Sequence, residues 1–165
     1  MEQIVQAVAD TLGTHISNQA VVFLISMVPI LELRGGLLAA KLLSVPMVQA
    51  IPLCILGNII PIPFILLLIR RVLQWMKKIP GLKRFAFWLE AKADKRSGQV
   101  EDAEFVGLML FVGIPLPGTG AWTGSLIAAL LEIDFKKSIV AELYGIVMAT
   151  VICSILWYGL LGIFI

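Results

Sequence analysis

The sequence predicts an all-α integral membrane protein, built as an inverted repeat of two units that each hold a re-entrant helical hairpin followed by a transmembrane helix. Of its 165 residues, 59% are hydrophobic and 15% are charged, whereas soluble domains have about 45–50% apolar and about 25% charged residues. Two long apolar segments are interrupted by charged or helix-breaking residues, and two are not. The halves of the chain share this order, which favours a repeat.

Residues 1–15 predict an amphipathic helix, because Ile4, Val5, Val8 and Leu12 fall on one helical face. We expect it to lie on the membrane surface, and a frayed terminus is the alternative.

Residues 18–44 predict the first re-entrant hairpin. The uncharged run Ala20–Leu31 would form a helix of about 18 Å, too short for a bilayer core of about 30 Å. One straight helix would place Glu32 and Arg34 at the membrane centre, at roughly 2.5–3.5 kcal/mol each. A hairpin that turns back at Glu32–Gly36 places both charges at a tip lined by protein instead.

Residues 45–72 predict a transmembrane helix, since 45–69 carry no charge and are long enough to cross the core. A kink is expected near Pro61. Residues 73–102 predict a basic linker with an interfacial helix, and nine of the thirteen basic residues lie between Arg70 and Arg96. Such a linker faces the cytoplasm of a bacterial inner membrane. Its expected partners are membrane lipids and not nucleic acid.

Residues 103–132 predict the second hairpin, because Ile114–Gly120 holds two prolines and two glycines. Residues 135–165 predict the last transmembrane helix. If 103–132 re-enter, Lys136 and Lys137 join the basic linker on the cytoplasmic side. Eleven of the thirteen basic residues then lie inside, against nine if the segment spans. We therefore expect re-entry.

Short stretches of the two halves also resemble each other, although the identity is low. The pairs are Pro29-Ile30-Leu31 with Pro115-Leu116-Pro117, Leu38-Ala39-Ala40 with Ile127-Ala128-Ala129, and Leu56-Gly57-Asn58 with Tyr144-Gly145-Ile146. Inverted repeats are the architecture of many secondary transporters, which bind substrate at the membrane midplane between the repeats.

The two turns predict the candidate binding site, since irregular backbone at membrane depth must be buried in protein or line a cavity. Helix N-termini near Gly36 and Ala121 would bind anions, and the guanidinium of Arg34 suits phosphate. The candidate substrate-binding residues are Arg34, Glu32, Gly35, Gly36, Pro117, Gly118, Thr119, Gly120, Trp122 and Asn58.

The acidic residues leave alternatives open. Glu32 either pairs with Arg34 or carries a coupling proton. Glu142 either carries a proton or forms a salt bridge with Lys137. Asn58 either caps a backbone group freed at the proline kink or contacts substrate. Thr119, Thr123 and Ser125 are expected to satisfy loop N–H groups.

No enzymatic activity, cofactor or metal site is expected. The apolar segments hold no histidine that could activate Ser125, and no metal-binding motif is present. Cys54 and Cys153 sit in apolar runs and are interpreted as small buried hydrophobic residues.

Two motifs carry a resemblance to a known family. Residues 29–36, Pro-Ile-Leu-Glu-Leu-Arg-Gly-Gly, and residues 113–124, Gly-Ile-Pro-Leu-Pro-Gly-Thr-Gly-Ala-Trp-Thr-Gly, resemble the bacterial small multidrug export family, which looks related to the DedA superfamily. The resemblance implies two facing re-entrant hairpins and the movement of lipids, including a polyprenyl phosphate carrier. The acidic residue of the first DedA hairpin matches Glu32. DedA proteins carry an arginine in the second hairpin, whereas Pro117-Gly118 is followed here by Thr119 and Gly120.

Three functions are compatible with these residues. The first is a transporter of an anionic amphiphile or lipid-linked phosphate, with Arg34 as ligand and Glu32 as proton carrier. The second is a proton-coupled exporter of small hydrophobic cations that uses Glu32 and Glu142. The third is a membrane scaffold that transports nothing. A homodimer is expected, because two spans and two hairpins are little protein to enclose a pathway.

Overall fold

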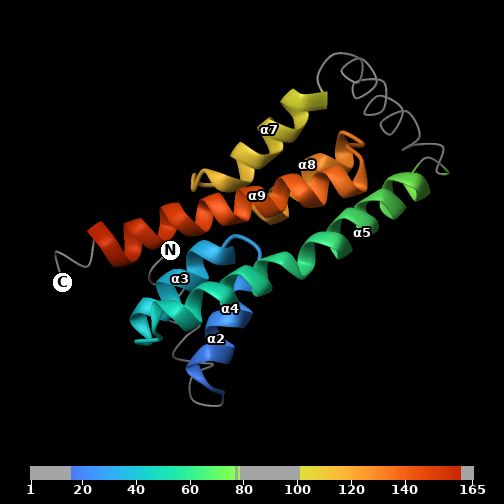
Figure 1. The fold of residues 1–165 in the computed structure, drawn as a ribbon. Helices are drawn as coiled ribbons and strands as arrows, with labels where there is room; N and C mark the ends of the chain where they lie inside the picture. Colours follow the sequence, from blue (N-terminus) through green and yellow to red (C-terminus); the bar gives the residue numbers. More distant parts are fainter. Residues whose placement is uncertain (1–15, 77, 79–100, 161–165) are drawn as a thin grey trace.

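The computed structural model of this chain describes residues 16–76, 78 and 101–160. All regular structure in these residues is helical, which confirms the all-α prediction for this part of the chain (Figure 1). The predicted helix in residues 1–15 and most of the linker at 73–102 lie outside the described residues. The helices are α2 (Asn18–Met27), α3 (Glu32–Leu42), α4 (Met47–Ile59), α5 (Pro61–Met76), α7 (Glu101–Gly113), α8 (Ala121–Leu130), α9 (Phe135–Ser154) and the π-helix η1 (Ile155–Leu160).

Two helical stretches are long and apolar enough to cross a membrane, Met47–Ile69 with 23 residues and Phe135–Gly159 with 25. At 1.5 Å per residue they measure about 35 and 38 Å, which exceeds the hydrocarbon core of about 30 Å. The first is interrupted between α4 and α5 at Ile60, directly before Pro61, near which the sequence predicts a kink. The apolar helices α2 and α8 have only 10 residues each.

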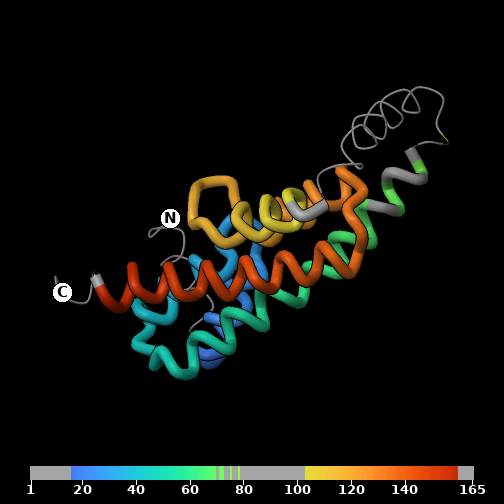
Figure 2. The backbone as a smooth tube through the Cα atoms, turned by 45° about the horizontal axis from the view of Figure 1, so that its top comes forward, coloured from blue at the N-terminus to red at the C-terminus, as the bar shows by residue number. Residues whose placement is uncertain are grey.

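The short helices pack on the long ones. Helix α2 lies against α3 and α4, α7 lies along α9, and α8 lies against α5 (Figure 1). Figure 2 shows the chain making a wide turn between α7 and α8. In both views α5 and α8 end, and α7 and α9 begin, at the same end of the molecule.

The first turn lies earlier than predicted, at Val28–Leu31 and not at Glu32–Gly36, which form the start of α3. Val28 is extended with φ −75° and ψ 132°, because the residue before a proline avoids helical backbone. Ile30 then reverses the chain at a φ of 76°. The glycines act in packing: a Cβ on Gly36 would lie 1.9 Å from the Ser26 Oγ, so this glycine lets α3 approach α2 closely.

The turns that follow α3 and α8 have the same conformation. Ser44 and Glu132, 88 residues later, both have a φ of 55°. The next residue of each turn donates a hydrogen bond to a carbonyl of the preceding helix. These bonds run from Val45 N to Ala40 O (2.8 Å) and from Ile133 N to Ala128 O (3.0 Å). This correspondence pairs Ala40 with Ala128, one residue away from the pairing read from the sequence.

Matching glycines sit where the long helices cross the first helix of each unit. A Cβ on Gly57 of α4 would lie 2.6 Å from the carbonyl oxygen of Phe23 in α2. A Cβ on Gly145 of α9, again 88 residues later, would lie 2.7 Å from the carbonyl oxygen of Met109 in α7. Both crossings require backbone contact that any larger residue would obstruct.

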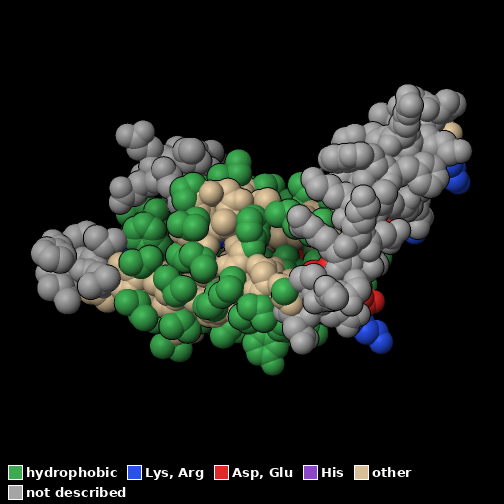
Figure 3. Space-filling model, turned by 90° about the horizontal axis from the view of Figure 1, so that it is seen from above, with side chains coloured by type: hydrophobic (Ala, Val, Ile, Leu, Met, Phe, Trp, Pro, Cys, Tyr) green, Lys and Arg blue, Asp and Glu red, His purple; other side chains and the backbone are tan. Residues whose placement is uncertain are grey.

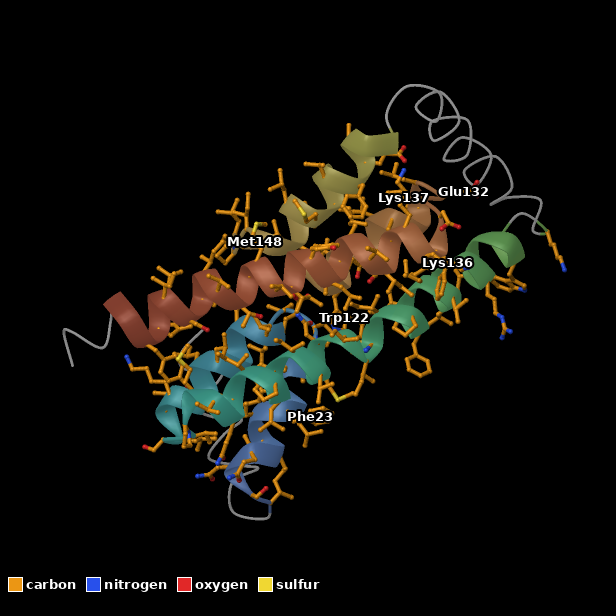
Figure 4. The ribbon with its side chains drawn as sticks, in the orientation of Figure 1. Phe23, Trp122, Glu132, Lys136, Lys137 and Met148 are labelled. Carbon is orange, nitrogen blue, oxygen red and sulfur yellow. The ribbon has the colours of Figure 1, made fainter. Side chains whose placement is uncertain are left out.

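The described surface is largely apolar, and most of its described basic residues lie at one end. Figure 3 shows hydrophobic side chains over most of the visible face, with Lys and Arg at one edge. Large apolar side chains such as Val48 (86% exposed) and Phe64 (69%) are mostly exposed. Glu132, Lys136 and Lys137 gather beside the turn between α8 and α9 (Figure 4). An apolar band with charges at one end is typical of a membrane protein.

Candidate functional site

Glu32 caps helix α8 from the other half of the chain. Its side chain is buried, with 4% exposed. Its carboxylate oxygens accept hydrogen bonds from Ala121 N (3.1 Å) and Trp122 N (3.0 Å). The first N–H groups of a helix have no partner within the helix, and the helix dipole favours a negative charge beside them. The N–H groups expected to bind an anionic ligand therefore bind Glu32 in this structure.

Gly120 leaves the space that the Glu32 carboxylate fills. A Cβ at Gly120 would lie 2.0 Å from Oε2 and 2.7 Å from Cδ of Glu32. The φ of Gly120 is 133° with ψ −176°, a backbone conformation that is essentially restricted to glycine. Gly118 also has a positive φ, 82°, but nothing lies within 4 Å of its would-be Cβ. Of these two glycines, only Gly120 has a side chain packed where its own Cβ would lie.

Arg34 holds the second turn together. Its guanidinium donates hydrogen bonds to Leu116 O (2.5 Å), Ile114 O (3.5 Å) and Thr119 Oγ1 (2.8 Å). The Thr119 hydroxyl also accepts a bond from Leu116 N at 3.2 Å, so it satisfies a loop N–H as predicted. Carbonyls just beyond a helix end need outside donors. Glu32 and Arg34 thus both bind the second turn, and neither uses its hydrogen bonds for the other.

Trp122 makes the reciprocal contact. Its indole Nε1 donates to the carbonyl of Met27, the last residue of α2, at 3.1 Å, and Figure 4 places the side chain in the middle of the molecule. Trp122 follows Arg34 by 88 residues, the offset that relates the two turns with positive φ. Each of these residues donates to carbonyls at the end of the first helix of the other unit or just beyond it. Such exchange is the pattern of a two-fold interface.

Glu142 is a second buried acid. It lies on α9 with 0% exposed, and the Ser125 hydroxyl donates a hydrogen bond to its Oε2 at 2.8 Å. Its Oε1 is buried and has no hydrogen-bond partner among the described residues. The interpretation of Glu142 as a salt bridge to Lys137 is therefore wrong. The prediction that Ser125 serves a loop N–H is also wrong, because Ser125 lies within α8, one turn beyond the loop.

The remaining candidates lie apart from this network. Asn58 is 3% exposed and its Oδ1 has no hydrogen-bond partner in the described residues, so it caps no backbone group through that oxygen. Pro117 and Gly118 are exposed at the tip of the second turn, and Gly35 is buried inside α3. The residues that the structure brings together are Glu32, Arg34, Thr119, Gly120 and Trp122.

Comparison with known proteins gives one match. A family model described as putative small multi-drug export protein matches residues 32–152. The matched stretch begins at Glu32 and includes the second turn and Glu142. No curated protein and no solved structure matches the chain.

Proposed function

Because the chain belongs to the putative small multi-drug export protein family, we propose that it is a proton-coupled transporter that exports small hydrophobic cations across the bacterial inner membrane. The observation that carries this proposal is Glu142, a fully buried acid on a long apolar helix with one carboxyl oxygen unpartnered in the described residues. An uncompensated buried carboxylate is costly, and either a proton or a cation removes that cost. Exchange of one for the other at Glu142 would couple export to proton entry.

The proposed topology has two re-entrant hairpins of opposite orientation around one site. The reciprocal contacts of Arg34 and Trp122 support a two-fold relation between the units. The second hairpin leaves from and returns to one end of the molecule (Figure 1), beside Lys136 and Lys137. That end is the cytoplasmic one in the proposal, since short cytoplasmic segments are rich in lysine and arginine.

The test is transport in reconstituted vesicles with an imposed pH gradient. Uptake of tetraphenylphosphonium and movement of protons are followed together. Glu142→Gln keeps the size of the side chain and removes its charge, so we expect it to abolish coupled flux. Ser125→Ala removes the only hydrogen bond that Glu142 accepts in the described residues, and it should lower the flux without abolishing it.

Glu132→Gln is the matched control. It removes an acid from the exposed turn between α8 and α9, away from the buried carboxyl, and should leave flux unchanged. If Glu142→Gln transports at the wild-type rate with the same proton movement, the proposed mechanism is wrong. If neither wild type nor variants move any cation, the scaffold interpretation gains.

A second candidate is transport of an anionic amphiphile, such as a lipid-linked phosphate. The supporting observation is that the N-terminus of α8 already holds a carboxylate, that of Glu32. A phosphate would bind the same N–H groups after displacing Glu32. The geometry ranks this function second because Arg34 and these N–H groups already bind protein atoms.

The two functions respond differently to mutation. Arg34→Ala should abolish transfer of a phosphate-bearing lipid probe if anions are carried and should spare cation export. Glu142→Gln should have the opposite effect. A homodimer is part of the proposal, and light scattering of the purified protein in mild detergent would show a monomer if it is wrong.

A further inference from the structure

The second hairpin contains a groove. The groove lies between α7 and α8 and has a volume of about 240 Å³. Apolar side chains form most of its lining, including Leu108, Phe111, Ile127 and Leu131, and Glu104 is the only charged residue among the described residues that line it. About 150 Å³ is enough for a benzene ring, so the groove has room for one ring or somewhat more.

The corresponding positions of the first hairpin are filled. Gly57 contacts Phe23 in α2, and the matching Gly145 contacts Met109 in α7, 86 residues after Phe23. The same offset pairs Gly107 with Val21 and Phe111 with Ile25. Val21 and Ile25 are both fully buried. Nothing lies within 4 Å of a Cβ built on Gly107. The groove therefore exists where a glycine replaces a core valine.

The mouth of the groove differs in the same way. In the first hairpin, Asn18 Nδ2 donates a hydrogen bond to Leu43 O at 3.2 Å and ties α2 to the turn after α3. Glu104 occupies the position that corresponds to Asn18, and Leu131 the one that corresponds to Leu43. An ionised carboxylate has no proton to donate to a carbonyl. Glu104 thus cannot form this bond as a carboxylate, and it places that carboxylate beside the apolar lining of the groove.

From this geometry we infer that the groove between α7 and α8 binds the aromatic or aliphatic part of a hydrophobic cation whose charge lies at Glu104. This site is distinct from Glu142, and its substrate class rests on the proposed function. An anion of the same shape is disfavoured by the Glu104 carboxylate. Glu132, Lys136 and Lys137 lie outside the groove lining, near the same end of the molecule (Figure 4).

The test measures binding and not transport. The purified full-length protein in detergent is dialysed against tetraphenylphosphonium or tetraphenylborate, which share a shape and have opposite charges, with protein-free micelles as the blank. Glu104→Gln should weaken phosphonium binding by about 1.4- to 5-fold, the effect of losing one partly exposed charge pair. It should leave borate binding unchanged. Gly107→Leu fills the groove and should abolish the phosphonium binding that remains in a Glu142→Gln background.

Two further variants separate this site from the transport mechanism. Glu132→Gln should bind phosphonium like the wild type. Glu142→Gln should also retain binding in the groove even though its coupled flux is lost. The inference is wrong if Glu104→Gln and Gly107→Leu both bind phosphonium like the wild type, or if borate binds equally well and responds equally to both changes. If Glu142→Gln loses coupled flux but Glu104→Gln and Gly107→Leu bind phosphonium like the wild type, the groove site is wrong and the proposed function stands.

Discussion

Gly120→Ala is the substitution whose effect follows most directly from the structure. The new Cβ would lie 2.0 Å from Oε2 of Glu32, so the carboxylate must leave the N-terminus of α8. Hydrogen bonds to charged groups contribute about 1.5–3 kcal/mol each, and Glu32 would lose two. The glycine-restricted backbone adds about 1–3 kcal/mol of strain. Allowing for partial replacement of these bonds by water, we expect the free energy of unfolding to fall by about 3–6 kcal/mol.

A double-mutant cycle separates the two contributions. In a Glu32→Ala background, Gly120→Ala meets no carboxylate and should cost only the backbone strain, about 1–3 kcal/mol. The coupling between the two positions should therefore be about 2–3 kcal/mol. Gly118→Ala is the matched control, because its φ is 82° but nothing lies within 4 Å of the new Cβ. It should cost about 1–2 kcal/mol.

Thermal unfolding in detergent can be followed with a thiol-reactive fluorophore. Cys54 and Cys153 are 0% and 2% exposed, so they should react only as the protein opens. The expected order of midpoints is wild type, Gly118→Ala and then Gly120→Ala, with the Gly120→Ala defect reduced in the Glu32→Ala background. Equal losses for the two glycine variants, or no relief by Glu32→Ala, would refute the contact between Glu32 and α8.

The same assay tests three other features. Gly57→Ala should lower the free energy of unfolding by about 1–3 kcal/mol through overpacking, because its Cβ would lie 2.6 Å from the carbonyl oxygen of Phe23. Gly107→Ala has nothing within 4 Å of its Cβ and should raise the free energy of unfolding by about 0.5–1 kcal/mol. Destabilisation by both substitutions would contradict the open space at Gly107. Ser44→Gly relieves a φ of 55° and should stabilise by about 0.5–1 kcal/mol, and a loss would refute the assigned turn. Trp122→Phe removes the hydrogen bond to the last carbonyl of α2 and should cost about 0.5–1.5 kcal/mol, whereas an unchanged midpoint would argue against that bond.

The helical class and the two long apolar stretches could be predicted from the sequence, because both depend on composition over many residues. The break before Pro61 was equally predictable, since proline lacks the N–H that a helix needs. The position of the first turn was wrong by a few residues. Glycines at 35 and 36 indicate a turn as readily as they indicate close helix packing, and only the neighbouring Ser26 shows which applies.

The functional contacts were harder to predict. The sequence marks Glu32 as an unusual acid in an apolar segment, but its partners are N–H groups about 90 residues away. Glu32 and Arg34 are two residues apart in the sequence, yet the hydrogen bonds of both side chains cross to the second turn and the start of α8. The partner of Glu142, Ser125, is a small polar residue whose role depends on how α8 lies against α9.

Single-cysteine labelling tests the central claim, that both turns lie inside the membrane and return to the side from which they came. Cys54 and Cys153 are first replaced by alanine. Ala103 and Lys136 flank the second hairpin, Gln19 and Gln49 flank the first, and all four are exposed.

Each of these four positions is then changed to cysteine in turn and labelled in inverted and right-side-out vesicles with a membrane-impermeant maleimide. We predict that cysteines at 103 and 136 react from the cytoplasmic side and those at 19 and 49 only from the opposite side. Reaction of the two positions of either pair from opposite sides would contradict the account.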